Sequence, residues 1–89
     1  MPTIHLLIKG KVQGVFYRAG AKKAAIELSV KGWVRNKDNG DVEALVTGTA
    51  VQLGKFVDWC RQGPKNALVT EVQETDCEEI SFDSFSIDR

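Results

Sequence analysis

The spacing of the hydrophobic residues changes several times along this chain, and these changes constrain its fold more than any other feature. Ile4, Leu6 and Ile8 alternate with His5 and Lys9, which is the two-residue period of a strand with one buried face. From about residue 17 the period becomes helical, and one apolar stripe contains Tyr17, Ala21, Ala24, Ala25 and Leu28. Because most of these residues are alanines, we expect this helix to lie close against the surface that it covers.

A β-hairpin is predicted next. The segments 30–36 and 41–47 have the composition of strands, and Asn39 and Gly40 lie between them. Asn and Gly both tolerate positive φ, so this pair is a strong hairpin signal.

A second helix is predicted after Thr49, which can form a capping box with Gln52, and the Gly63-Pro64 pair should end it. Two strands should follow, a polar one at 67–77 with a possible bulge and a short one at 81–88. The order is therefore β-α-β-β-α-β with a short extra strand at the C-terminus. This order predicts an α+β fold, a ferredoxin-like two-layer sandwich in which two helices cover one face of an antiparallel sheet.

Composition limits the possible partners. With 89 residues and a net charge of zero, the chain is expected to be a single domain, residues 1–89, without a broad basic field for nucleic acid. No apolar run is long enough for a membrane span, and no signal-peptide pattern is present, so we expect a cytoplasmic protein and, by default, a monomer. Cys60 and Cys77 have no spacing typical of a metal site; free thiols are expected, although a disulfide stays open.

The stretch GKVQGVFYR, residues 10–18, carries the first candidate site. A predicted strand ends there, a loop containing Gly14 follows, and Arg18 lies in the first turn of the predicted helix. A cation is mildly unfavourable at that end of a helix, where unpaired N–H groups concentrate positive charge. An anion bound between those groups and the arginine would explain the choice. The alternative is a tight turn with a solvent-facing arginine.

Asn36 is the second candidate, because the end of its strand could lie beside this loop and its amide could hold a water molecule or a substrate oxygen. The alternative is a local turn contact in the hairpin. Other conspicuous residues favour structural roles. His5 is expected to be structural, and the aromatic side chains to pack the core or cover its edges. Asp38, Asp41 and Glu43 are expected to be solvated charges around the hairpin.

Two segments of the chain, GKVQGVFYR (10–18) and GWVRNKDNGDVEALVTG (32–48), closely resemble the two signatures of the acylphosphatase family. Arg18 and Asn36 have the same separation as in that family, and GPKNALVTEV (63–72) and FSI (85–87) resemble its later segments. The resemblance implies a ferredoxin-like enzyme that hydrolyses acyl phosphates to a carboxylate and inorganic phosphate, without a metal or other cofactor.

By this resemblance, the phosphate is held by the loop residues together with the arginine, and Asn36 orients the attacking water. The implied phosphate-binding residues are Gln13, Gly14, Val15, Phe16, Tyr17 and Arg18, with Arg18 and Asn36 catalytic. Lys37 departs from the small polar residue that many relatives carry, and it could change the charge at the mouth of the site.

Three other functions stay open on the residues alone: a small-anion sensor with the same cradle, an RNA-binding module, and a domain acting on a carbamoyl or other acyl-transfer intermediate within a larger complex. The second is disfavoured by the zero net charge and by a first strand without exposed aromatics. A sensor would need Arg18 and the loop but not Asn36. The physiological acyl phosphate is not specified by the sequence.

Overall fold

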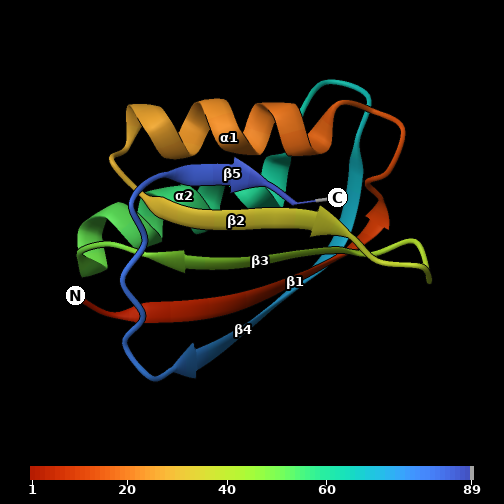
Figure 1. The fold of residues 1–89 in the computed structure, drawn as a ribbon. Coiled ribbons are helices and arrows are strands. Elements are labelled where there is room, and N and C mark those ends of the chain that lie inside the picture. Colours follow the sequence, from red (N-terminus) through yellow and green to blue (C-terminus); the bar gives the residue numbers. More distant parts are fainter. Residues whose placement is uncertain (89) are drawn as a thin grey trace.

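The computed structural model describes residues 1–88, which form one five-stranded sheet and two helices (Figure 1). In chain order the elements are β1 (Thr3–Lys11), α1 (Tyr17–Glu27), β2 (Lys31–Asn36), β3 (Val42–Thr47), α2 (Ala50–Gln62), β4 (Leu68–Cys77) and β5 (Phe85–Ile87). Neither helix, within this described part, is long and apolar enough to cross a bilayer.

The strand order is β4-β1-β3-β2-β5, and both helices lie on the same side of the sheet (Figure 1). The first four strands pair in antiparallel fashion, as the ferredoxin-like prediction requires. The fifth does not, because β5 runs parallel to β2. After β4 the chain crosses to the opposite edge of the sheet and enters β5 in the direction of β2, so the sheet is mixed rather than purely antiparallel.

The structure changes one predicted detail of the strands and confirms another. The final strand covers only Phe85–Ile87, not 81–88, because pairing with β2 is limited to the three residues that follow the crossing segment. The bulge expected near β4 is present: the partner of Lys9 is Glu71 and that of Gly10 is Val69, so Thr70 is skipped. Gly10 has a φ of 125°, and an added Cβ would lie 2.1 Å from the carbonyl oxygen of Leu68, so only glycine fits there.

The hydrophobic core lies between the sheet and the helices. Alanines at 21, 24 and 25 are buried on α1 together with Tyr17, whereas Leu28 lies just beyond the helix and is half-buried. The small residues let the two helices approach, and Gly20 is so close to the Trp59 ring that a Cβ would clash with it. Tyr17 also donates its hydroxyl to the carbonyl oxygen of Cys60 at 2.7 Å, which satisfies one of the free carbonyls at the end of α2.

The capping box of Thr49 and Gln52 and the end of α2 at Gly63 are both observed, as predicted.

Cys60 and Cys77 are free thiols. Burial raises the pKa of the Cys60 thiol to about 12, so this sulfur is held as an unreactive thiol in the core.

The prediction that Asp41 and Glu43 are solvated was wrong, since each residue is only 8% exposed. Glu43 lies on the face of the sheet away from the helices, where it contacts His5 Nε2 and Arg35 Nε, each at 2.7 Å. Burial by itself raises the pKa of the Glu43 carboxyl, but the hydrogen bonds from His5 and Arg35 outweigh it and hold the pKa below its ordinary value. These charges are therefore structural partners across strands.

This depressed pKa predicts an acid-sensitive contribution to stability. A carboxylate whose pKa is lower in the folded state stabilises the fold above its unfolded pKa, and the contribution is lost as the pH falls through the folded value. The free energy of unfolding of Glu43→Gln should therefore be lower than that of the wild type at about pH 6, and the difference should shrink below about pH 4.5. Urea titrations across this range measure it, with Glu74→Gln on exposed β4 as control; parallel pH profiles for wild type and Glu43→Gln would contradict it.

Candidate active site

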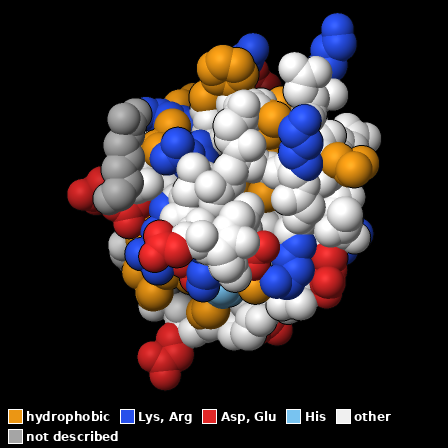
Figure 2. Space-filling model, turned by 90° about the vertical axis from the view of Figure 1, so that its right-hand side faces the viewer, with side chains coloured by type: hydrophobic (Ala, Val, Ile, Leu, Met, Phe, Trp, Pro, Cys, Tyr) orange, Lys and Arg blue, Asp and Glu red, His pale blue; other side chains and the backbone are white. Residues whose placement is uncertain are grey.

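The ends of β1 and β2 and the start of α1 meet at one end of the molecule (Figure 1). An open cleft of about 300 Å³ lies there. Figure 2 views this end of the molecule, where acidic, basic and hydrophobic side chains are interspersed around an uncharged centre. Residues from three separate segments line the cleft: Val12, Gly14, Phe16, Tyr17, Arg18, Ala19, Asn36 and Ile87. Arg18 and Asn36, eighteen positions apart in the chain, are thus brought to one site.

The loop between β1 and α1 has the backbone of an anion-binding turn. Gly14 and Phe16 both adopt left-handed conformations, with φ values of 73° and 64°. Backbone that alternates between left- and right-handed conformations directs successive N–H groups toward one point. Phe16 is the N-cap of α1 and provides no side-chain cap, and the first turn holds no acidic residue. The N–H groups at the start of α1 are therefore not occupied by the helix's own cap.

Arg18 is half-buried and lines the cleft, so the alternative of a solvent-facing arginine in a simple turn is not supported. Its guanidinium group and the start of α1 both bring positive charge to the same hollow. This concentration is suited to an anion with several oxygens, which can accept from a guanidinium fork and from backbone amides together.

Asn36 ends β2 on the side of the sheet that faces the helices, two residues after the buried Val34. Its Oδ1 atom is buried and has no hydrogen-bond partner among the described residues. The turn contact expected as an alternative is made by Asn39 instead, whose Oδ1 accepts from the Asp41 N–H at 3.1 Å. A buried amide oxygen without a partner is costly for folding, so Asn36 is an acceptor available to a ligand or a water molecule.

The hairpin after β2 is closed by the Lys37 N–H, which donates to the carbonyl oxygen of Asp41 at 2.8 Å. Gly40 has positive φ as predicted, but Asn39 does not. The Asn39 side chain stabilises the turn through its contact with the Asp41 N–H, and the closing hydrogen bond joins residues 37 and 41, so this is a longer turn than a two-residue Asn-Gly connection.

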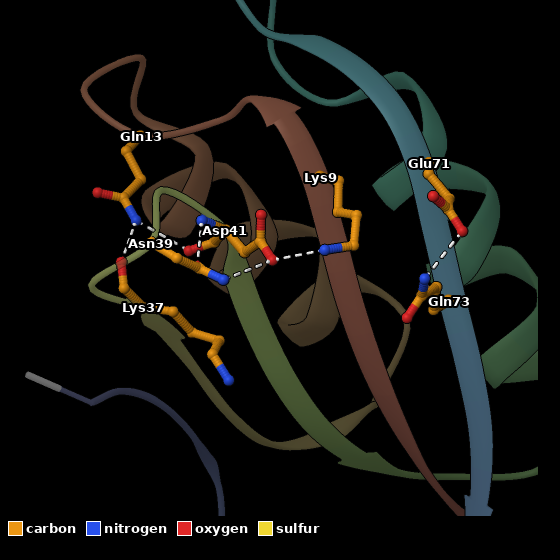
Figure 3. A network of polar contacts seen from close by, with 7 residues as sticks. All are labelled: Lys9, Gln13, Lys37, Asn39, Asp41, Glu71 and Gln73. Carbon is orange, nitrogen blue, oxygen red and sulfur yellow. Dashed lines mark hydrogen bonds and ion pairs between the residues drawn. The ribbon is translucent and has the colours of Figure 1, made fainter.

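Gln13 connects the loop to this hairpin. Its Nε2 atom donates to the carbonyl oxygens of Lys37 and Asp41 at 2.7 and 2.8 Å (Figure 3). Asp41 is in turn fixed by Lys9 Nζ at 2.9 Å. The residue that follows Asn36 is therefore tied directly to the loop that precedes α1 and Arg18, and sequence patterns gave no sign of this contact.

The predicted residues divide into two groups by position. Gly14, Phe16, Tyr17 and Arg18 line the cleft, whereas Gln13 faces the hairpin and the Val15 side chain is buried in the core. Ile87 also lines the cleft but was not anticipated, because its place depends on the crossing of β5 to the far edge of the sheet. Lys37 lies beside a neighbouring hollow and its side chain points away from Gln13 in Figure 3.

Comparison with known proteins agrees with this arrangement. The family model for acylphosphatase matches residues 4–87. The chain belongs to the acylphosphatase family. A protein named acylphosphatase from Syntrophus aciditrophicus is 48% identical, over 98% of this chain and 92% of its own length. The crystal structure of acylphosphatase from Bacillus subtilis has a TM-score of 0.97 and 31% identity, with all of both chains covered. The structure of an acylphosphatase from Coxiella burnetii has a TM-score of 0.94 and 34% identity, over 98% of this chain and 92% of that chain.

The acylphosphatase family model covers every segment of the candidate site, since the matched range includes the loop before α1, Asn36 and β5. Ile87, at the end of that range, lies in the cleft beside the two predicted catalytic residues. The C-terminal strand is therefore part of the acylphosphatase fold and of its candidate site.

Proposed function

We propose that the chain is a single catalytic domain that hydrolyses acyl phosphates, with Arg18 and Asn36 as its catalytic residues. The observation that carries the residue assignment is the shared cleft. A cation and an uncapped helix start lie in it together with the buried, unpartnered Oδ1 of Asn36. The overall activity follows from membership in the acylphosphatase family.

In this proposal the phosphoryl group binds in the loop. Backbone N–H groups of residues 13–18 donate to its oxygens, and the Arg18 guanidinium supplies two further donors and a permanent positive charge. The left-handed Gly14 and Phe16 support this, because they turn the backbone into a concave surface. Gln13 and Val15 would contribute through the main chain, since their side chains are committed elsewhere.

Asn36 would orient the attacking water. Its Oδ1 accepts a hydrogen bond from one O–H of the water, which leaves a lone pair of the water oxygen free to attack phosphorus. The new P–O bond forms as the bond between phosphorus and the acyl oxygen breaks, and the products are a carboxylate and inorganic phosphate. A carboxylate departs without protonation, so positioning and charge stabilisation suffice. The other proton of the water would pass to a phosphate oxygen, and the proton hydrogen-bonded to Asn36 would stay on the attacking oxygen.

The test is hydrolysis of acetyl phosphate by the wild-type protein with EDTA present. We expect turnover well above the rate in buffer, with phosphate and acetate released in equal amounts. A protein that binds inorganic phosphate but does not hydrolyse the substrate would be an anion sensor. A pH–rate profile that requires an enzymatic base near neutral pH would contradict the proposed route of the proton. The cytoplasmic location, the monomeric state and the absence of a cofactor remain predictions.

The contacts of Gln13 predict a positioning role. Gln13→Ala removes both donors to the hairpin, so Asn36 should be held less well relative to the loop. We expect kcat to fall about tenfold with KM nearly unchanged, and the free energy of unfolding to fall by about 1–2 kcal/mol. Gln73→Ala is the control, because that side chain is exposed and its hydrogen bond within residues 1–88 is to Glu71, away from the cleft (Figure 3). A rise in KM with an unchanged kcat would instead assign Gln13 to substrate binding.

A further inference from the structure

Phe16 is an exposed aromatic residue in an unfavourable backbone conformation. Its side chain is 83% exposed, and its φ is 64°. The left-handed conformation follows from the shape of the loop, but a phenylalanine is a poor choice for it, since Gly or Asn adopts it at lower cost. An exposed ring also contributes nothing to the core. Neither the backbone nor folding stability therefore explains an aromatic side chain at this position.

The position of Phe16 in the cleft supplies a reason. The cleft that Phe16 lines contains the polar residues Arg18 and Asn36, and it also contains the apolar residues Ala19 and Ile87. A phosphoryl group bound on the loop would leave the acyl group to extend along the cleft. An apolar acyl group could then cover part of the exposed ring, and the area removed from water would favour binding.

The neighbouring hollow fits a charged acyl group less well. Arg35 and Lys37 line this hollow of about 500 Å³, but so do Asp38 and Asp88. Arg35 is also paired with Glu43 at 2.7 Å. A free carboxylate on the acyl group would meet as many negative as positive side chains there. The hollow therefore provides no net electrostatic attraction for such a substrate.

We propose, on the basis of the function proposed above, that Phe16 forms an apolar platform that makes this enzyme prefer acyl phosphates with large apolar or aromatic acyl groups. The platform would act on the acyl group alone. Its effect is therefore visible as a ratio of kcat/KM between two substrates, and a general disturbance of the loop cancels in that ratio.

The experiment compares benzoyl, acetyl and succinyl phosphate in wild type and in Phe16→Asn, which retains a residue suited to positive φ. The ratio of kcat/KM for benzoyl over acetyl phosphate should fall about tenfold in Phe16→Asn. Phe16→Tyr keeps the ring and should keep the ratio. Ile26→Asn is a matched control, because Ile26 is an exposed apolar residue of α1 that lies outside the cleft; its rates should equal those of the wild type.

An unchanged ratio in Phe16→Asn would overturn the inference while leaving the enzyme assignment intact. A wild-type preference for succinyl phosphate would also overturn it, in favour of the hollow beside Lys37. If the wild type hydrolyses none of the three substrates faster than buffer, the proposed function fails and the inference fails with it.

Discussion

Replacing Arg18 with alanine should lower kcat/KM for an acyl phosphate by about 10²- to 10³-fold, the range expected when a donor to transition-state charge is lost. The side chain lies in the cleft at the start of α1, where it would meet phosphoryl oxygens together with the loop amides. Inorganic phosphate should also inhibit the variant more weakly, because the same donors bind it. Arg18→Lys should recover only part of the activity, since lysine restores the charge but not the planar fork.

The same substitution should not destabilise the fold. A cation near a helix N-terminus opposes the helix dipole, so its removal is expected to leave the free energy of unfolding unchanged or raise it by about 0.3–1 kcal/mol. Lys23→Ala provides the control, because it removes one exposed cation from the same helix away from the cleft. Its hydrolysis rate should match the wild type. Equal losses of activity in Arg18→Ala and Lys23→Ala would point to a general charge effect and against a specific phosphate contact.

Replacing Asn36 with alanine should lower kcat by about 10²-fold or more, while the inhibition constant of inorganic phosphate changes little. This separation follows from the proposed roles, since Asn36 holds water and the loop with Arg18 holds phosphate. Phosphate inhibition and steady-state kinetics on the same variant measure the two effects independently. The result also decides between an enzyme and an anion sensor, because a sensor does not need Asn36.

Asn36→Ala should unfold at the same or a slightly higher urea concentration than the wild type. The Oδ1 atom is buried without a hydrogen-bond partner in the described part of the chain, and removing such an atom relieves a desolvation cost of about 1–3 kcal/mol, offset by the lost packing of the side chain. Asn66→Ala, an exposed position in the loop before β4, is the control for activity and stability. If phosphate inhibition weakens in Asn36→Ala as strongly as in Arg18→Ala, the division of roles proposed for these residues is wrong.

Much of the fold could be predicted because its signals are local. The alternation of Ile4, Leu6 and Ile8, the alanine stripe of α1, and the capping box at Thr49 all depend on residues within a few positions of one another. One local signal failed at Asn39, whose φ is not positive, and the other errors concern contacts between distant segments. The carboxylate of Glu43 looked solvated because its partner His5 lies 38 positions away on another strand.

The candidate site shows the same division. Its two signature segments are contiguous in sequence, so Arg18 and Asn36 were found, together with the family. The link between the segments was not found, because the Gln13 side chain bridges 24 and 28 positions to reach Lys37 and Asp41. Nothing in the local sequence near Gln13 distinguishes a side chain that binds substrate from one that ties a loop to a hairpin.

The order of helices and strands, the family and the residue types of the site could all be predicted from the amino-acid sequence. These depend on local periodicity, backbone preferences and contiguous motifs. The folded structure was needed to find that β5 pairs parallel to β2 and brings Ile87 to the cleft, that Glu43 is buried, and that the Oδ1 of Asn36 has no hydrogen-bond partner within residues 1–88. The physical reason is that burial and hydrogen-bond satisfaction depend on atoms brought together by folding, and their separation along the chain does not predict them.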